Sequence, residues 1–305
     1  MMFIRYAFQT IFLAVLLINT PVMAYQDCNR ASVLNNQALD LPNERAYYPQ
    51  QKRLLNQALQ QCPNHPESHN NLADIFEREQ NYPQAIYHYR QALKARPGYS
   101  NAWYGLGETY YKQGQFPLSL EAHLHACKTD KDSKARIVEL LKNNQYAVTE
   151  EGQILEKESL LLLYDKSRRQ MMGKLISACG FRAKIRHVIV FRNIVFNTNA
   201  MTLKKSSTKQ IQKIAAALKV IKPTLVKVKG HSDAQPWRRR SKAESKRLNL
   251  RLSQRRAETV KNLLVSQGFP SRRMRAEGYG GSQPLVSGNS KAAWAKNRRV
   301  EIEVN

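Results

Sequence analysis

Two charged side chains in the C-terminal half of the sequence have the types and spacing of a receptor for a zwitterion. Asp233 comes just after an expected strand, Leu225–Lys229, at the kind of strand end where open α/β sheets bind ligands. Arg256 lies on the following expected helix, one turn after Leu252 and on the same face. A carboxylate can bind an ammonium group while a guanidinium binds a carboxylate with two parallel hydrogen bonds. The alternative is an internal ion pair between Asp233 and Arg256.

Catalytic chemistry is not indicated by the rest of the sequence. It contains no nucleophile elbow, no His-Glu-x-x-His motif, no P-loop and no dinucleotide-binding glycine pattern. Glu244 and Glu258 are lone carboxylates on a basic helix, and His231 is more simply a strand-end residue satisfied by the backbone. We therefore expect a protein that is not an enzyme and that uses no cofactor and no metal.

The elements that must position these residues begin near residue 185. Ser206–Ile221 and Ser245–Gln267 have apolar residues at helical spacing, and Pro223 and Gly268 follow their ends. The expected strands have alternating or continuously apolar patterns and lie at His187–Phe196, Leu225–Lys229, Arg275–Gly280 and Val300–Val304. This order, βαβαββ, predicts an α/β sandwich with helices on a sheet.

Four segments of this region resemble the OmpA-like peptidoglycan-binding domain family, and together they cover about residues 185–305. They are Gly230-His231-Ser232-Asp233, Asn249 to Ala257 (NLRLSQRRA), Gly278-Tyr279-Gly280, and Asn297-Arg298-Arg299-Val300-Glu301. The resemblance implies that the zwitterion is the diaminopimelate side-chain end of a cell-wall stem peptide. It also implies polar contacts from Asn249 and Arg299 and an apolar wall from Leu252.

The sequence departs from that family in the loop after Asp233. Asp233 and Asn249 are 16 positions apart, more than is usual in the family, and the loop between them contains Trp237-Arg238-Arg239-Arg240-Ser241-Lys242. Two interpretations remain: a divergent binder with altered ligand preference, or a domain that has lost binding.

Charge is concentrated in the same half of the chain. The whole sequence carries a formal charge of +26, and residues 181–305 contain 29 basic and 6 acidic side chains. Arg238, Arg239 and Arg240 are therefore candidates for contact with anionic envelope polymers. A nucleic-acid interface is the rival interpretation, which we do not favour because the sequence has an export signal and no nucleic-acid motif.

A 34-residue period marks the first half of the chain. Pro66–Tyr99 aligns with Ser100–Ser133, with small residues at matched positions such as Ala73 with Gly107 and Ala92 with Ala126. These segments resemble tetratricopeptide (TPR) repeats. A degenerate repeat precedes them, and Lys134–Asn143 is expected to form a capping helix. The resemblance implies binding of a protein partner on a concave surface, and the alternative is a spacer.

The N-terminus has the pattern of a signal peptide. Arg5 precedes a short apolar stretch, and small or permitted residues precede Tyr25, so we expect cleavage after Ala24. No apolar run reaches the ~18 residues of a membrane-spanning helix. Four cysteines remain in the exported chain, at positions 28, 62, 127 and 179. An even number allows two disulfides with three possible connectivities, although burial as free thiols is an alternative.

The sequence thus predicts four segments: a signal peptide at 1–24, an α-helical TPR-like solenoid at 25–145, a helical linker at 146–184, and an OmpA-like α/β domain at 185–305. The predicted function is that of a periplasmic envelope protein, associated with the cell wall or outer membrane, that binds peptidoglycan and an unidentified protein. The alternative is a scaffold subunit of a secretion or motility assembly whose wall site is vestigial.

Overall fold

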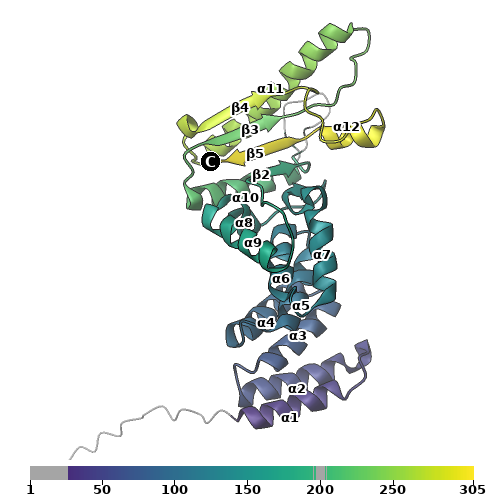
Figure 1. Cartoon of the computed structure of the whole chain (residues 1–305), viewed down its shortest axis with the longest axis vertical. Coiled ribbons are helices and arrows are strands. Elements are labelled where there is room, and N and C mark those ends of the chain that lie inside the picture. The colour runs from purple at the N-terminus through teal and green to yellow at the C-terminus, as the bar shows by residue number, and fades with distance from the viewer. Residues whose placement is uncertain (1–26, 195, 197–202, 204) are drawn as a thin grey trace, which may run out of the picture.

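The computed structural model describes residues 27–194, 196, 203 and 205–305. The expected signal peptide at 1–24 lies outside these residues. The helical first half stacks into an elongated array, and a sheet with flanking helices follows it at the other end of the molecule (Figure 1). In the described part of the chain, no helix is both long enough and apolar enough to cross a membrane.

Seven helices build the array from antiparallel hairpins that pack one on the next. Their bounds are α1 (Cys28–Leu39), α2 (Tyr48–Gln61), α3 (Pro66–Arg78), α4 (Tyr82–Ala95), α5 (Ser100–Lys112), α6 (Phe116–Ala126) and α7 (Lys131–Leu141), with a 3₁₀ turn at Arg45–Tyr47. A proline in the first two positions starts α2, α3, α4 and α6, where its missing N–H removes no hydrogen bond. The expected capping helix is α7, whose Ile137 and Leu140 are fully buried.

Small residues let the helices of the array approach closely, as the period predicts. Ala73, Ala85, Ala92 and Ala102 are fully buried. At Gly107, an added Cβ would lie 2.7 Å from the His123 ring, so no larger residue fits there without a shift. These contacts explain why the matched positions of the period are small.

Two disulfides tie the helices together, and they use all four cysteines. Cys28 pairs with Cys62 across the first hairpin. Cys127, at the end of α6, pairs with Cys179, at the end of α9 (Lys166–Ala178). Among the described residues no cysteine is free, which decides between the two alternatives that the sequence left open.

The segment 146–184, which the sequence predicts as a helical linker, is built into both of its neighbours. It begins in a 3₁₀ turn, Lys142–Ala147, and contains α8 (Lys157–Tyr164), α9 and a short strand, β1 (Val148–Thr149). Gln115 of the repeats donates a hydrogen bond to the carbonyl of Ile154 over 2.7 Å. On the other side the Tyr164 hydroxyl donates to the carbonyl of Ile302. One continuous set of buried apolar residues therefore runs from the repeats into the sheet.

The C-terminal sheet has five strands in the order β1-β2-β5-β3-β4, and β2 and β3 are each antiparallel to β5. The remaining elements are β2 (Val188–Phe191), α10 (Lys205–Ile221), β3 (Val226–Gly230), α11 (Lys242–Ser266), a 3₁₀ turn at Ser271–Arg273, β4 (Met274–Gly278), α12 (Lys291–Asn297) and β5 (Val300–Val304). This confirms the expected βαβαββ order, to which the structure adds α12 and β1.

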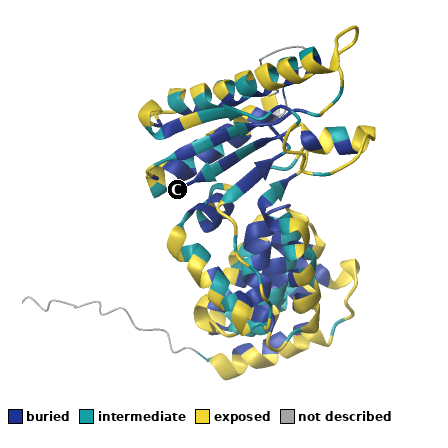
Figure 2. Cartoon of the chain, turned by 45° about the horizontal axis from the view of Figure 1, so that its top comes forward, coloured by how far each residue is buried: buried dark blue, intermediate teal, exposed yellow. Residues whose placement is uncertain are grey.

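Alternation along β3 and β5 gives the sheet one buried and one polar face. Val226, Val228, Val300 and Ile302 are almost fully buried, whereas Lys227, Lys229, Glu301 and Glu303 are only partly covered. In Figure 2 this alternation appears as dark blue and teal segments along the strands. The site residues lie at one end of the sheet, where β3 and β4 end and β5 begins.

Candidate ligand-binding site

The helix α11 lies directly on the ends of β3 and β4, which explains two of the glycine motifs. A Cβ added to Gly230 would lie 2.1 Å from the backbone oxygen of Ser253, and one added to Gly278 would lie 2.3 Å from the backbone nitrogen of Gln254. Only glycine allows this approach. As a result, the side chains at the strand ends and those of α11 meet at one edge of the sheet.

A small cavity of about 150 Å³ opens at this edge. Its walls come from the end of β2, the turn after β3, α11 and the turn between α12 and β5. Arg256 and Arg299, both predicted site residues, line it together with Arg192 and Arg298. Glu151 is the one carboxylate among the described lining residues. Arginines therefore dominate the charged lining, although Arg192, Arg298 and Arg299 are each paired with a carboxylate.

Among the four lining arginines, Arg256 is the one whose guanidinium has no ion pair in the described part of the chain. Its Nε is buried and has no hydrogen-bond partner in the described part of the chain. The guanidinium carbon lies 5.2 Å from the centre of the Phe196 ring, within the range of a cation–π contact. Burial and the nearby Arg298 lower its pKa, and Asp233 opposes that shift. A carboxylate in the cavity would accept a charge-assisted hydrogen bond from this group.

Asp233 does not pair with Arg256, as an internal ion pair would require. Its Oδ2 accepts a hydrogen bond of 2.8 Å from Nη1 of Arg298, and its Oδ1 accepts one from the backbone N–H of Gln235. The carboxylate of Asp233 thus contacts Arg298, which lines the cavity. A ligand ammonium would have to share Asp233 with this arginine.

Asn249 supports the long loop instead of pointing to the cavity. Its amide oxygen accepts a 2.7 Å hydrogen bond from the indole N–H of Trp237, and its amide nitrogen donates to the carbonyl of Gln235. Asn249 is not among the described residues that line the cavity, and its contact with a ligand stays a prediction. Arg238, Arg239 and Arg240 are exposed in this loop, and Leu252 is half-buried on α11.

Arg299 lines the cavity but has most of its donors occupied. Its Nη2 lies 2.6 Å from Oε1 of Glu301, and it also donates to the carbonyls of Gln283 and Asn297. Burial tends to raise the pKa of Glu301, but its contacts with His231 and Arg299 hold that pKa at about 2. Arg299 therefore fixes the cavity wall more than it offers a free guanidinium.

Arg298, His231 and Arg192 are among the lining residues that were not selected from the sequence. Arg298 belongs to the Asn-Arg-Arg motif, from which the sequence analysis selected only the neighbouring Arg299. His231 lines the cavity with a ring that is stacked on Tyr279, and its Nε2 lies 3.7 Å from Oε1 of Glu301, beyond hydrogen-bond distance. Burial lowers its pKa, so the ring is neutral near pH 7. Arg192 lies before all four motifs, and no sequence signal marks it.

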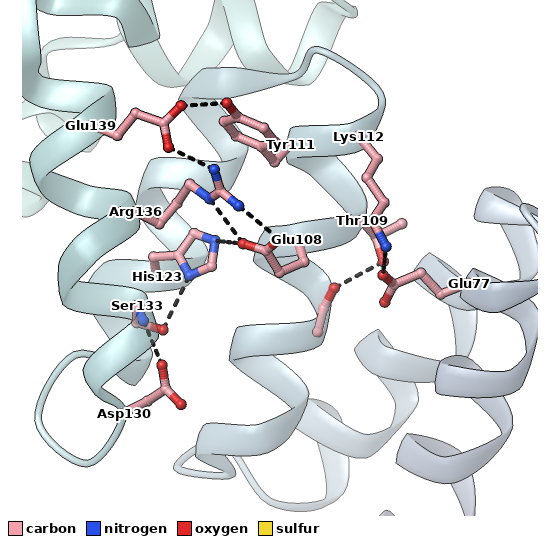
Figure 3. Close-up of polar contacts among 11 residues, drawn as sticks. Glu77, Glu108, Thr109, Tyr111, Lys112, His123, Asp130, Ser133, Arg136 and Glu139 are labelled. Atoms are coloured by element: carbon pink, nitrogen blue, oxygen red, sulfur yellow. Dashed lines mark hydrogen bonds and ion pairs between the residues drawn. The ribbon is translucent and has the colours of Figure 1, made fainter. Parts of the chain in front are cut away.

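The repeat array carries a second set of polar groups, on α5, α6 and α7. Arg136 of α7 donates two hydrogen bonds to Glu108 of α5 and pairs with Glu139, whose carboxylate also accepts from Tyr111 (Figure 3). His123 lies 3.3 Å from the same Glu108. Burial opposes ionisation of Glu108, but His123 and Arg136 lower its pKa to about 2. These ion pairs join neighbouring repeats.

A shallow pocket of about 350 Å³ lies beside this network, between α3 and α5. Several side chains that line it are polar: Asn70, Asn71, Asp74, Asn101, Tyr104 and Lys112. This pocket lies on the repeats, well separated in sequence from the arginine-lined cavity.

Comparison with known protein families supports both halves of this description. Residues 195–298 match the OmpA family, and residues 54–87 and 74–114 match tetratricopeptide repeats. The two resemblances expected from the sequence are confirmed.

Curated relatives are similar over part of the chain. The probable lipoprotein YiaD of Escherichia coli (strain K12) is 34% identical over 113 residues, which is 37% of this chain and 48% of that protein. The peptidoglycan-associated lipoprotein of Brucella melitensis is 28% identical over 112 residues, 37% of this chain and 62% of the relative. The chain thus covers less than two thirds of either relative's length.

Among solved structures, the cell wall anchor of the T6SS from Pseudomonas aeruginosa is 32% identical, with a TM-score of 0.33, over 38% of this chain and 78% of that one. The peptidoglycan-associated lipoprotein from Burkholderia pseudomallei is 26% identical, with a TM-score of 0.32, over 37% and 88% of the two chains.

Proposed function

We propose that the protein is a non-catalytic component of the cell envelope that binds peptidoglycan through the cavity of its OmpA-family domain. The observation that carries this proposal is the Nε–H of Arg256, which is buried and unbonded in a cavity lined by three further arginines. A buried donor without a partner costs free energy, and a ligand carboxylate would satisfy it.

The proposed ligand is the diaminopimelate end of a stem peptide, which carries an ammonium and a carboxylate on one carbon. Arg256 would bind the carboxylate, and Asp233 would face the ammonium beside Arg298. The names of relatives, peptidoglycan-associated lipoprotein and cell wall anchor, agree with this class of ligand. The test is co-sedimentation of the exported chain, residues 25–305, with purified sacculi. The protein should pellet with sacculi and be released by free diaminopimelate, and a protein that stays in the supernatant would contradict the proposal.

The proposed location is the periplasm, next to the cell wall or outer membrane. The N-terminal export pattern supports it, as do two disulfides, which persist in oxidising compartments. N-terminal sequencing of the periplasmic fraction should find Tyr25 first. Retention of Met1 in a membrane fraction would contradict this assignment.

For the repeats, the proposed role is to bind a protein partner through the polar pocket between α3 and α5. Its amides can recognise an extended backbone, as hydrogen-bonding groups in a concave site do. Cross-linking in cells should capture a partner that is lost on Asn71→Ala and kept on Asn36→Ala, a change on α1 outside this pocket. If no cross-link depends on Asn71, the array is better described as a spacer.

A further inference from the structure

Arg192, which directly follows β2, lines the same cavity as Arg256. Its side chain is 15% exposed, and its Nε is buried without a hydrogen-bond partner in the described part of the chain. Two arginines from different elements thus line one cavity of about 150 Å³, and each has a buried Nε–H without a hydrogen-bond partner in the described part of the chain. The other two lining arginines differ, since Arg298 pairs with Asp233 and Arg299 pairs with Glu301.

The position of Arg192 is set by the segment that follows the repeats. Its backbone N–H donates to the carbonyl of Thr149 in β1 over 3.2 Å, and its Nη1 pairs with Glu150. The Thr149 hydroxyl donates to the side chain of Asn193 over 2.8 Å, and the Asn193 amide donates to Gln210 of α10. All three of these supporting side chains are buried. Their hydrogen bonds limit the movement of the backbone that carries Arg192.

Both Arg192 and the strand β1 lie outside residues 195–298, the part that matches the OmpA family. The cavity of this chain is therefore completed by residues that precede the matched domain. The ion pair with Glu150 uses Nη1 of Arg192, whereas Nε has no hydrogen-bond partner in the described part of the chain.

We propose that Arg192 is a second carboxylate-binding residue that, with Arg256, clamps the carboxylate end of the ligand. This inference rests on the proposed function, because it concerns the same cavity. Two guanidinium groups on one carboxylate make the carboxylate a requirement for binding. Ligands that offer only ammonium groups are repelled by the same arginines.

The experiment compares two probes that differ only in their carboxylates. Diaminopimelate carries two carboxylates, and 1,5-diaminopentane is the same carbon chain with both amines and no carboxylate. Calorimetric titration of residues 25–305 should detect binding of diaminopimelate alone. Arg192→Gln should weaken that binding about tenfold or more, the effect of losing a charge-assisted hydrogen bond. Arg182→Gln removes the same charge from an exposed position and should change binding less than twofold, that is, by roughly 0.4 kcal/mol at most.

Arg192→Lys keeps the charge and the contact with Glu150 but lacks Nε, so it should also weaken binding while the melting temperature stays near that of the parent protein. If both Arg192 variants bind diaminopimelate like the parent and Arg256→Lys does not, Arg192 is no ligand residue and the inference fails, while the proposed function stands. If the parent protein itself does not bind diaminopimelate, the proposed function fails first.

Discussion

Arg298 donates a 2.8 Å hydrogen bond to the carboxylate of Asp233, which is the group that the sequence assigned to a ligand ammonium. Asp233 is only 15% exposed in its side chain, and Arg298 is 45% exposed. The arginine is thus the more exposed partner. A ligand can displace it without disturbing the strand end, because Asp233 stays fixed by the N–H of Gln235.

This relationship gives a first prediction. Asp233→Ala leaves both Arg298 and a ligand ammonium without a carboxylate, so affinity for diaminopimelate should fall by on the order of 2–3 kcal/mol. Arg298→Gln frees Asp233 for the ligand and should not lower affinity. Titration of the two variants separates the roles. Unchanged affinity in Asp233→Ala would mean that Asp233 is only an internal partner of Arg298.

The inserted loop should act through long-range charge. Arg238, Arg239 and Arg240 are exposed, and the loop is anchored by Trp237 on Asn249, so replacing all three arginines by glutamine should leave the cavity intact. Sacculus binding should weaken mainly at low salt, because exposed charges are screened within ~10 Å at 0.1 M ionic strength. A nucleic-acid-binding protein would behave in the opposite way, with DNA retention abolished by this change and unaffected by Asp233→Ala.

Glu108 makes the stability of the repeats depend on pH. Its pKa is about 2 in the folded protein and 4.5 in the unfolded chain, so its stabilisation is complete above pH 4.5 and is lost as the pH falls toward 2. The contribution at neutral pH is on the order of 3 kcal/mol. In urea unfolding, Glu108→Gln should therefore be less stable than the parent at pH 7, and the difference should shrink below pH 4.5. Glu44→Gln, at an exposed position, controls for the lost charge. A difference that stays constant down to pH 2 would contradict the assignment.

The disulfide between Cys127 and Cys179 should stabilise the junction of the repeats with α9. Replacing both cysteines by serine should lower the free energy of unfolding by about 2–4 kcal/mol, since the bridge closes a long loop in the unfolded chain. Replacing Cys28 and Cys62 instead alters only the first hairpin and should leave diaminopimelate binding unchanged. Thiol titration of the denatured, non-reduced protein should find no free thiol, and a count of four would contradict both bridges.

Much of the fold could be predicted from the sequence because its signals are local. The 34-residue period of small and large residues predicts which helix faces are buried, and the alternation in Val300–Val304 does the same for a strand. Neither signal depends on residues that are distant in the sequence. The segment 146–184 is different. Its strand β1 has two residues, too short for a pattern, and its pairing with β2 depends on tertiary contacts such as Thr149 with Asn193.

The candidate site was predictable to the extent that its residues lie in motifs. The structure places Arg256 and Arg299 together in the lining of one cavity, and their contact with a ligand stays a prediction. The pairing of Asp233 with Arg298 was not predicted. Arg298 and Arg299 are adjacent, and the sequence does not indicate which of the two side chains lies near the carboxylate. Asn249 accepts a hydrogen bond from Trp237 of the long loop, a contact that no local sequence pattern indicates. Arg192 is one of 49 basic residues and became a candidate only through its unbonded Nε.

The central claim, that Arg256 binds the carboxylate of a wall peptide, is tested most directly by one matched pair of variants. Arg256→Lys keeps the charge and removes the Nε–H and the planar fork, whereas Arg251→Lys makes the same change at an exposed position of the same helix. We predict that Arg251→Lys pellets with sacculi and is released by diaminopimelate like the parent, while Arg256→Lys remains largely in the supernatant. Equal pelleting and equal competition for the two variants would contradict the account.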